Sequence, residues 1–132
     1  MPNISFEYSA NLEGQVDLPG FCEALRRAAI ETGVFPEAGV RVRGLRCDHY
    51  AIADGHPDNG FIDISVRLRG GRPQEAKEAA TAHLFKAARA FLAPVIAAQP
   101  IALSLEMRDI DPALSPKLNT IRDHMKERSA HG

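Results

Sequence analysis

Alternation of apolar and polar residues predicts four β-strands in this chain. In residues 3–8, Ile4, Phe6 and Tyr8 share one side while the residues between them are polar, as in a strand with one buried face. The same period of two predicts three further strands, at residues 40–43, 61–69 and 101–108. The turn-forming residues 53–60 predict a loop between the second strand and the third.

Two longer segments repeat their apolar residues at helical spacing, and each follows a strand. Asp17 is placed to cap the first helix and Gly33 to end it, whereas Pro73 suits the first turn of the second helix and Pro94 should kink or end it. The apolar positions are Leu18, Phe21, Cys22, Leu25, Ala28 and Ala29 in the first helix, and Ala76, Ala80, Leu84, Ala87, Phe91 and Val95 in the second. A weaker, polar helix is predicted from Pro116 to Glu127.

The order strand, helix, strand therefore occurs twice, which predicts an α+β fold of two tandem βαβ units. We expect a four-stranded mixed sheet with two helices on one face, a short C-terminal helix, and a single domain over residues 1–132. Two helices can cover only one face of such a sheet. The other face, which carries polar and arginine side chains, should meet water or another subunit.

One irregularity in the alternation falls at Gly44. Val40 to Arg43 alternates regularly, but after the glycine Leu45 and Cys47 take the positions that arginines occupy before it. A bulge or bend at Gly44 would account for this change of phase.

Composition narrows the possible functions. Of the 132 residues 45% are hydrophobic and 25% charged, as in ordinary globular proteins, and 16 lysines and arginines nearly balance 17 acids, which argues against nucleic acid as a partner. No secretory leader or bilayer-spanning segment is recognisable, so we expect a cytoplasmic protein without a membrane partner. The spacing of the two cysteines and five histidines predicts neither a disulfide nor a metal site.

Arginines nevertheless gather in two parts of the chain. They are Arg41, Arg43 and Arg46 in the first part, and Arg67, Arg69 and Arg72 in the second. On a molecule that is neutral overall, such groups can form a local cationic site for a small anion.

Several segments together carry a resemblance to a known family. They are residues 2–11 (PNISFEYSAN), 17–20 (DLPG), 32–36 (TGVFP), 38–41 (AGVR), 53–55 (ADG) and 71–72 (GR). From Pro2 to about Pro116 the chain resembles the 5-carboxymethyl-2-hydroxymuconate isomerases of the tautomerase superfamily, in which a proline after the initiator methionine opens the first strand and acts as the catalytic base. The resemblance implies a homotrimer without cofactor or metal. It also implies keto-enol isomerisation of a carboxylated dienol during bacterial breakdown of homoprotocatechuate.

The implied chemistry assigns roles to particular residues. A proton shuttle needs a base whose conjugate acid has a pKa near working pH, and burial together with nearby guanidinium groups would lower the pKa of the Pro2 amine toward it, once Met1 is removed. Arg41 and Arg72 could hold the carboxylates of a dicarboxylate substrate and stabilise an enolate oxygen. Arg43 is a further substrate-binding candidate, and polar pairing on the sheet is the simpler role for Arg43 and Glu7.

Other interpretations of the same residues remain open. Without the resemblance, Pro2 would be only a rigid start to a strand, Arg41 a solvated strand residue and Arg72 a loop charge. The same fold could instead serve a hydratase, dehalogenase or decarboxylase of an unsaturated acid. A trimer that binds a dicarboxylate without catalysis is the third possibility.

Overall fold

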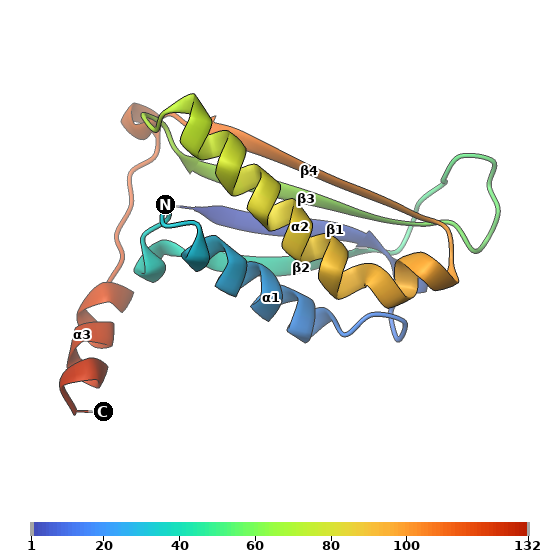
Figure 1. The fold of residues 1–132 in the computed structure, drawn as a ribbon, viewed down its shortest axis with the longest axis horizontal. Coiled ribbons are helices and arrows are strands. Elements are labelled where there is room, and N and C mark those ends of the chain that lie inside the picture. Colours follow the sequence, from blue (N-terminus) through green and yellow to red (C-terminus); the bar gives the residue numbers. More distant parts are fainter. Residues whose placement is uncertain (1, 132) are drawn as a thin grey trace.

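The computed structural model describes residues 2–131, the last of these by its backbone alone, and its centre is a four-stranded sheet with two long helices on one face (Figure 1). The strands are β1 (Asn3–Ser9), β2 (Arg41–Cys47), β3 (Gly60–Arg69) and β4 (Ile101–Ile110), and the helices are α1 (Leu18–Glu31) and α2 (Gln74–Ala98). In the sheet order β2-β1-β3-β4, β1 is parallel to β2, β3 is parallel to β4, and β1 is antiparallel to β3. The predicted α+β fold, with a mixed sheet built from two βαβ units, is confirmed.

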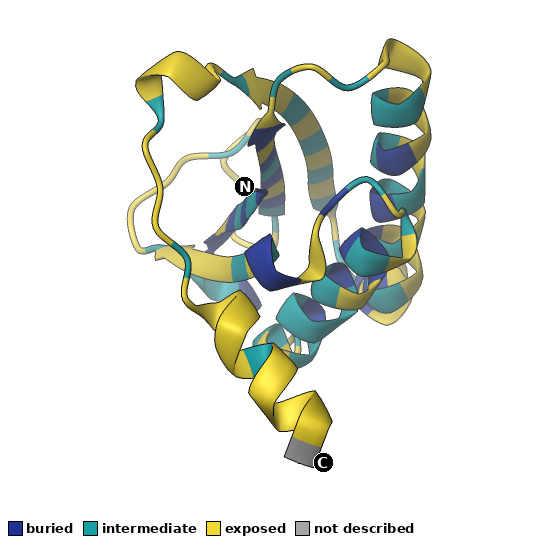
Figure 2. Ribbon diagram, turned by 90° about the vertical axis from the view of Figure 1, so that its left-hand side faces the viewer, coloured by how far each residue is buried: buried dark blue, intermediate teal, exposed yellow. Residues whose placement is uncertain are grey.

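Strand β1 lies inside the sheet, and its alternation decides which residues enter the core. Ile4, Phe6 and Tyr8 are buried beneath the helices, together with alternate residues of β3 from Ile62 to Leu68. Figure 2 shows these buried positions on the strands and on the sides of the helices that face them. Burial of this many apolar side chains is the main force that fixes the strand register.

The ends of α1 follow from its sequence as predicted. The Asp17 carboxylate accepts a hydrogen bond from the Gly20 amide at 3.1 Å, which satisfies a donor that the first turn leaves free. After Thr32 the chain leaves the helix at Gly33, whose φ of +74° favours glycine.

Helix α2 agrees with the prediction at Pro94 and differs from it in the buried stripe. The helix continues to Ala98, but its last turns run in a different direction from the rest, as expected of a kink at Pro94 (Figure 1). The buried stripe passes through Ala88 and Leu92, whereas Ala87 and Phe91 are only half-buried.

Neither α2 nor any other helix within residues 2–131 combines the length and the continuous apolar character that a bilayer span requires.

The bulge expected at Gly44 is a wrong prediction. Strands β1 and β2 pair residue by residue along their whole length, with Gly44 opposite Phe6. A Cβ atom at Gly44 would lie 2.5 Å from Cζ and 2.7 Å from Cε2 of the Phe6 ring. Glycine stands here because the ring occupies the space above it, and Leu45 simply faces the open side of the sheet.

The chain after β4 crosses the end of the sheet. It passes through a short 3-10 turn at Pro112–Leu114 and continues without regular structure, before α3 (Ile121–His131) begins five residues later than predicted. Asn119 explains this start, since its side chain accepts a hydrogen bond from the Ile121 amide at 2.9 Å. Helix α3 extends away from the sheet and is exposed along nearly its whole length (Figures 1 and 2).

The contact between Phe6 and Gly44 gives a first prediction. Gly44→Ala should lower the free energy of unfolding by about 1–3 kcal/mol, because the added methyl group overlaps the buried ring. Urea denaturation measures this loss. In a Phe6→Leu background the same substitution should cost clearly less, since the smaller side chain leaves room. Equal losses in both backgrounds would show that the ring does not set the requirement for glycine.

Candidate active site

Pro2 is buried at the start of β1. Because side chains alternate along a strand, Pro2 lies on the same side as Ile4, and less than 2% of it is exposed. It lines a hollow of about 510 Å³ at the end of the sheet, within the size range of small-molecule sites. Pro36 and Leu68 contribute apolar wall to this hollow.

Arg72 lies in the same hollow as Pro2, held there by the backbone. Its Nε donates to the Val34 carbonyl at 2.7 Å and its Nη1 to the Arg69 carbonyl at 2.9 Å. The turn that brings it back toward the sheet passes through Gly71, whose φ is +110°. The structure thus brings together two of the residues singled out in the sequence.

Arg41 and Arg43 lie on the other face of the sheet. Arg41 pairs with Asn3 and Arg43 with Ser5, and these partners alternate with the buried residues of β1. Arg41 lines a second hollow, of about 330 Å³, with Asn3 and Arg69. Arg43 lines neither hollow.

The two hollows are neighbours. Both are lined by Arg69, from the end of β3, and by Lys117 and Leu118, from the segment before α3. The side chains that line both hollows therefore lie between Arg41 and Pro2. A ligand that contacts Arg69 or Lys117 lies at the boundary between the two hollows.

Lys117 and Arg122 also line the Pro2 hollow, although the sequence pattern gives neither of them a functional role. Both belong to the segment predicted as a polar helix, and nothing in its local pattern distinguishes them from ordinary surface charges. A tertiary contact of the folded chain places these two residues at the hollow. The Asn119 side chain donates to the Ala38 carbonyl at 2.8 Å, which ties this segment to the turn at Glu37–Gly39, near the start of β2.

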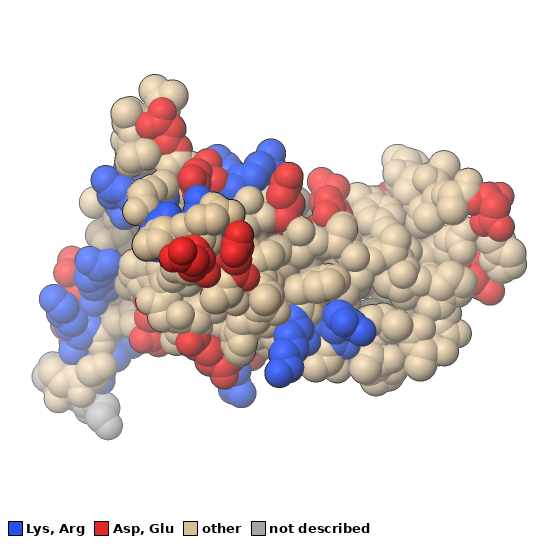
Figure 3. Space-filling model, turned by 45° about the horizontal axis from the view of Figure 1, so that its top comes forward, with Lys and Arg blue, Asp and Glu red and all other residues tan. Residues whose placement is uncertain are grey.

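The charges around Pro2 are mostly positive. Arg69, Arg72, Lys117 and Arg122 line its hollow with one carboxylate, that of Asp123. Within residues 2–131 none of these five groups forms an ion pair, whereas Arg26 and Arg27 on α1 both pair with Glu23. Figure 3 shows many basic side chains at this end of the molecule. Unpaired cations in a hollow favour an anionic ligand.

Neither of the two cysteines lines the Pro2 hollow. Cys22 and Cys47 are free, and burial raises the pKa of the Cys22 thiol, which leaves it protonated and unreactive at neutral pH. Among the described residues, no three His, Cys, Asp or Glu side chains gather in a way that could hold a metal ion.

Comparison with known proteins decides the family. The model of the 5-carboxymethyl-2-hydroxymuconate isomerase family matches residues 2–125. The chain belongs to this family. It is similar to the 5-carboxymethyl-2-hydroxymuconate Delta-isomerase of Escherichia coli, with 31% identity over 121 residues that span 92% of this chain and 96% of that protein.

A solved structure with the name of this family is similar over nearly the whole chain, and a more distant structure shares the fold. A crystal structure of a 5-carboxymethyl-2-hydroxymuconate delta-isomerase superposes with a TM-score of 0.89 at 28% identity, covering 95% of this chain and 93% of that one. A symmetric trimer of fused 4-OT has a TM-score of 0.63 at 16% identity, with 88% and 93% of the chains covered, and shows the shared fold alone. The family and fold expected from the sequence are both confirmed.

The contrast between Arg72 and Arg41 gives a second prediction. Arg72→Ala should lower the free energy of unfolding by about 1–2 kcal/mol, because the Val34 and Arg69 carbonyls lose their donor. Arg41→Ala removes an exposed side chain without such bonds and should change it by less than about 0.5 kcal/mol. Chemical denaturation of the two variants compares them. Equal stability of both would contradict a structural anchor at Arg72.

Proposed function

We propose that this isomerase moves a proton within an unsaturated hydroxy or keto dicarboxylate, with the Pro2 amine as general acid and base. One observation carries the proposal: a fully buried proline, second in the chain, lines a hollow with four cations that form no ion pair within residues 2–131. Membership of the 5-carboxymethyl-2-hydroxymuconate isomerase family supports the reaction class. The proposed substrate is 5-carboxymethyl-2-hydroxymuconate, whose carboxymethyl group adds a third carboxylate to the two of the muconate chain, or a close dicarboxylate analogue, formed in the breakdown of homoprotocatechuate.

The proposed mechanism requires removal of Met1. While Met1 is attached, the Pro2 nitrogen belongs to a peptide bond and can neither take nor give a proton. Met1 itself lies outside the described residues. Once it is removed, Pro2 carries a secondary amine in a buried position among cations, and both circumstances disfavour the ammonium form and lower the pKa of the amine.

The reaction then needs one base and one anion-stabilising group. The neutral amine takes a proton from the substrate hydroxyl, and negative charge spreads from that oxygen through the conjugated chain. The resulting ammonium returns the proton to a carbon of that chain, which leaves a ketone and shifts the double bonds. Arg72 is the proposed partner of the reacting end, since a guanidinium can hold a carboxylate and the developing oxyanion together. Arg41 and Arg43 remain candidates for substrate binding from the open face.

The same proposal includes a homotrimer. Support comes from the open face of the sheet, where Arg41, Arg43 and Arg67 alternate with core residues on a surface that is left uncovered by the helices of the described residues. The fused 4-OT of the same fold is a symmetric trimer. Packing of such faces between copies would enclose the arginines near the Pro2 hollow.

A third prediction tests the amine. A variant with one extra alanine before Pro2 should lose at least about 99% of the isomerase activity, because the ring nitrogen becomes an amide. The assay follows the ultraviolet absorbance of the dienol substrate, and mass spectrometry confirms the N-terminus of each preparation. Pro2→Ala, which retains a primary amine after Met1 removal, serves as the matched control and should keep partial activity. Full activity of the extended variant would overturn the proposal.

The same preparations separate the alternative reactions. Hydration product, released halide or carbon dioxide from unsaturated acids, with no isomerisation, would indicate a different enzyme of this fold. Tight binding of a dicarboxylate with no turnover in Met1-free protein would indicate a binding module.

A fourth prediction concerns assembly. Sedimentation equilibrium at neutral pH should give a mass three times the 14.4 kDa of one chain. Reversing charge on the open face with Arg43→Glu should shift the mass toward the monomer, whereas Lys126→Glu on the exposed helix α3 should leave the trimer intact. A monomeric wild-type protein would contradict the proposed assembly.

A further inference from the structure

The segment between β4 and α3 and the first turn of α3 contribute two of the four cations around Pro2, Lys117 and Arg122. We propose that Lys117 and Arg122 bind a second carboxylate of the ligand, beyond the one that Arg72 holds, and so set the preference of the site for ligands with more than one carboxylate. This inference rests on the proposed function for the identity of the ligand. Three observations support it: the path of the chain after β4, the hydrogen bonds that fix this part of the chain, and the number of N–H groups of Arg72 that remain available to a ligand.

The path of the chain brings these residues to the hollow from the far edge of the sheet. After β4 the segment crosses the end of the sheet past the start of β1 and reaches the turn before β2, on the opposite edge (Figure 1). Lys117 lines the Pro2 hollow and the neighbouring Arg41 hollow at once, whereas Arg122 lines the Pro2 hollow alone. The two cations therefore lie along one wall, which is built separately from the wall that carries Arg72.

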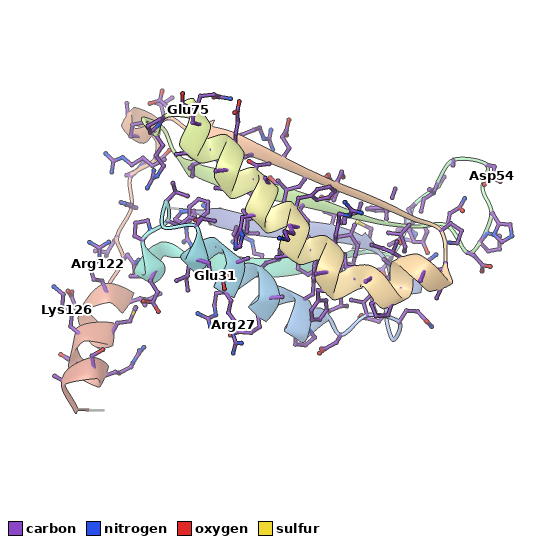
Figure 4. The ribbon with its side chains drawn as sticks, viewed as in Figure 1. Arg27, Glu31, Asp54, Glu75, Arg122 and Lys126 are labelled. Carbon is purple, nitrogen blue, oxygen red and sulfur yellow. The ribbon has the colours of Figure 1, made fainter. Side chains whose placement is uncertain are left out.

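Asn119 fixes the position of this wall. Its Nδ2 donates to the Ala38 carbonyl at 2.8 Å, and its Oδ1 accepts from the Ile121 amide at 2.9 Å. One side chain thus ties the segment to the Glu37–Gly39 turn and starts the helix that carries Arg122 in its first turn. Figure 4 shows Arg122 at the end of α3 nearest the sheet, with Lys126 farther out along the helix.

Arg72 can serve one carboxylate but not two. A guanidinium has five N–H donors, and two of them are engaged with the Val34 and Arg69 carbonyls, so three remain for a ligand. Those three suit one bidentate carboxylate. A ligand with a further carboxylate brings a second anion, and Lys117 and Arg122 lie in the same hollow without an ion pair to any of the described residues.

The test compares two ligands that differ in one carboxylate. Muconate is a six-carbon diene with two carboxylates, and sorbate is the same diene with a methyl group in place of one of them. Calorimetric titration of Met1-free protein measures both affinities without relying on turnover. Loss of two charge-assisted contacts in Lys117→Gln/Arg122→Gln should weaken muconate binding by about 10- to 100-fold and leave sorbate binding within about twofold. The control Lys126→Gln should alter neither.

Each possible result of the titrations either supports the inference or overturns it. Selective loss of muconate affinity supports it, and it does so even in a protein without isomerase activity, in which case only the proposed reaction fails. Equal weakening of both ligands, no weakening of either, or failure of the wild type to bind muconate would overturn it. An active isomerase with unaltered muconate binding in the double variant would refute the inference and leave the proposed function intact. Thermal unfolding checks that the double variant stays folded.

Discussion

Alternation along β1 is the constraint on which the rest of this structure depends. The strand is hydrogen-bonded on both edges, so a slip of one residue would remove Ile4, Phe6 and Tyr8 from the core and break two sets of strand pairs. Pro2 precedes this strand by one residue and is buried by the same parity. The place of the proposed catalytic nitrogen is therefore maintained by the stability of the whole hydrophobic core.

The same parity explains why the arginines divide between two hollows. Arg41 pairs with Asn3, which faces away from the helices, while Arg72 returns on the side of Pro2 after the turn at Gly71. Arg69 at the end of β3 and Lys117 from the crossing segment border both spaces. The candidate site thus combines a rigid floor from the sheet with a wall from a segment distant in sequence, and one asparagine side chain ties that wall to the core.

Periodicity was sufficient to predict the order of strands and helices, because each element buries one regular face. Periodicity failed where a tertiary contact, and not the local pattern, explains the presence of a single residue. The change of phase at Gly44 predicts a bulge, but the glycine instead accommodates the Phe6 ring. At the second proline-containing helix the prediction of a kink or an end at Pro94 holds as a kink, since α2 bends and continues to Ala98. For the site, the resemblance indicates Pro2, Arg41 and Arg72. The structure places Pro2 and Arg72 in one hollow and Arg41 in the neighbouring one. Lys117 and Arg122 could not be predicted, since only the path of the folded chain brings them there.

The candidate site joins the two ends of the polypeptide. Pro2 is among the first residues to be synthesised, whereas Lys117, Leu118, Asn119, Arg122 and Asp123, which line the same hollow, leave the ribosome at the end of translation. The hollow therefore cannot form before nearly the whole chain has been made. Any trimming of the N-terminus that the proposed mechanism requires can take place on the nascent chain, before this end of the sheet is complete.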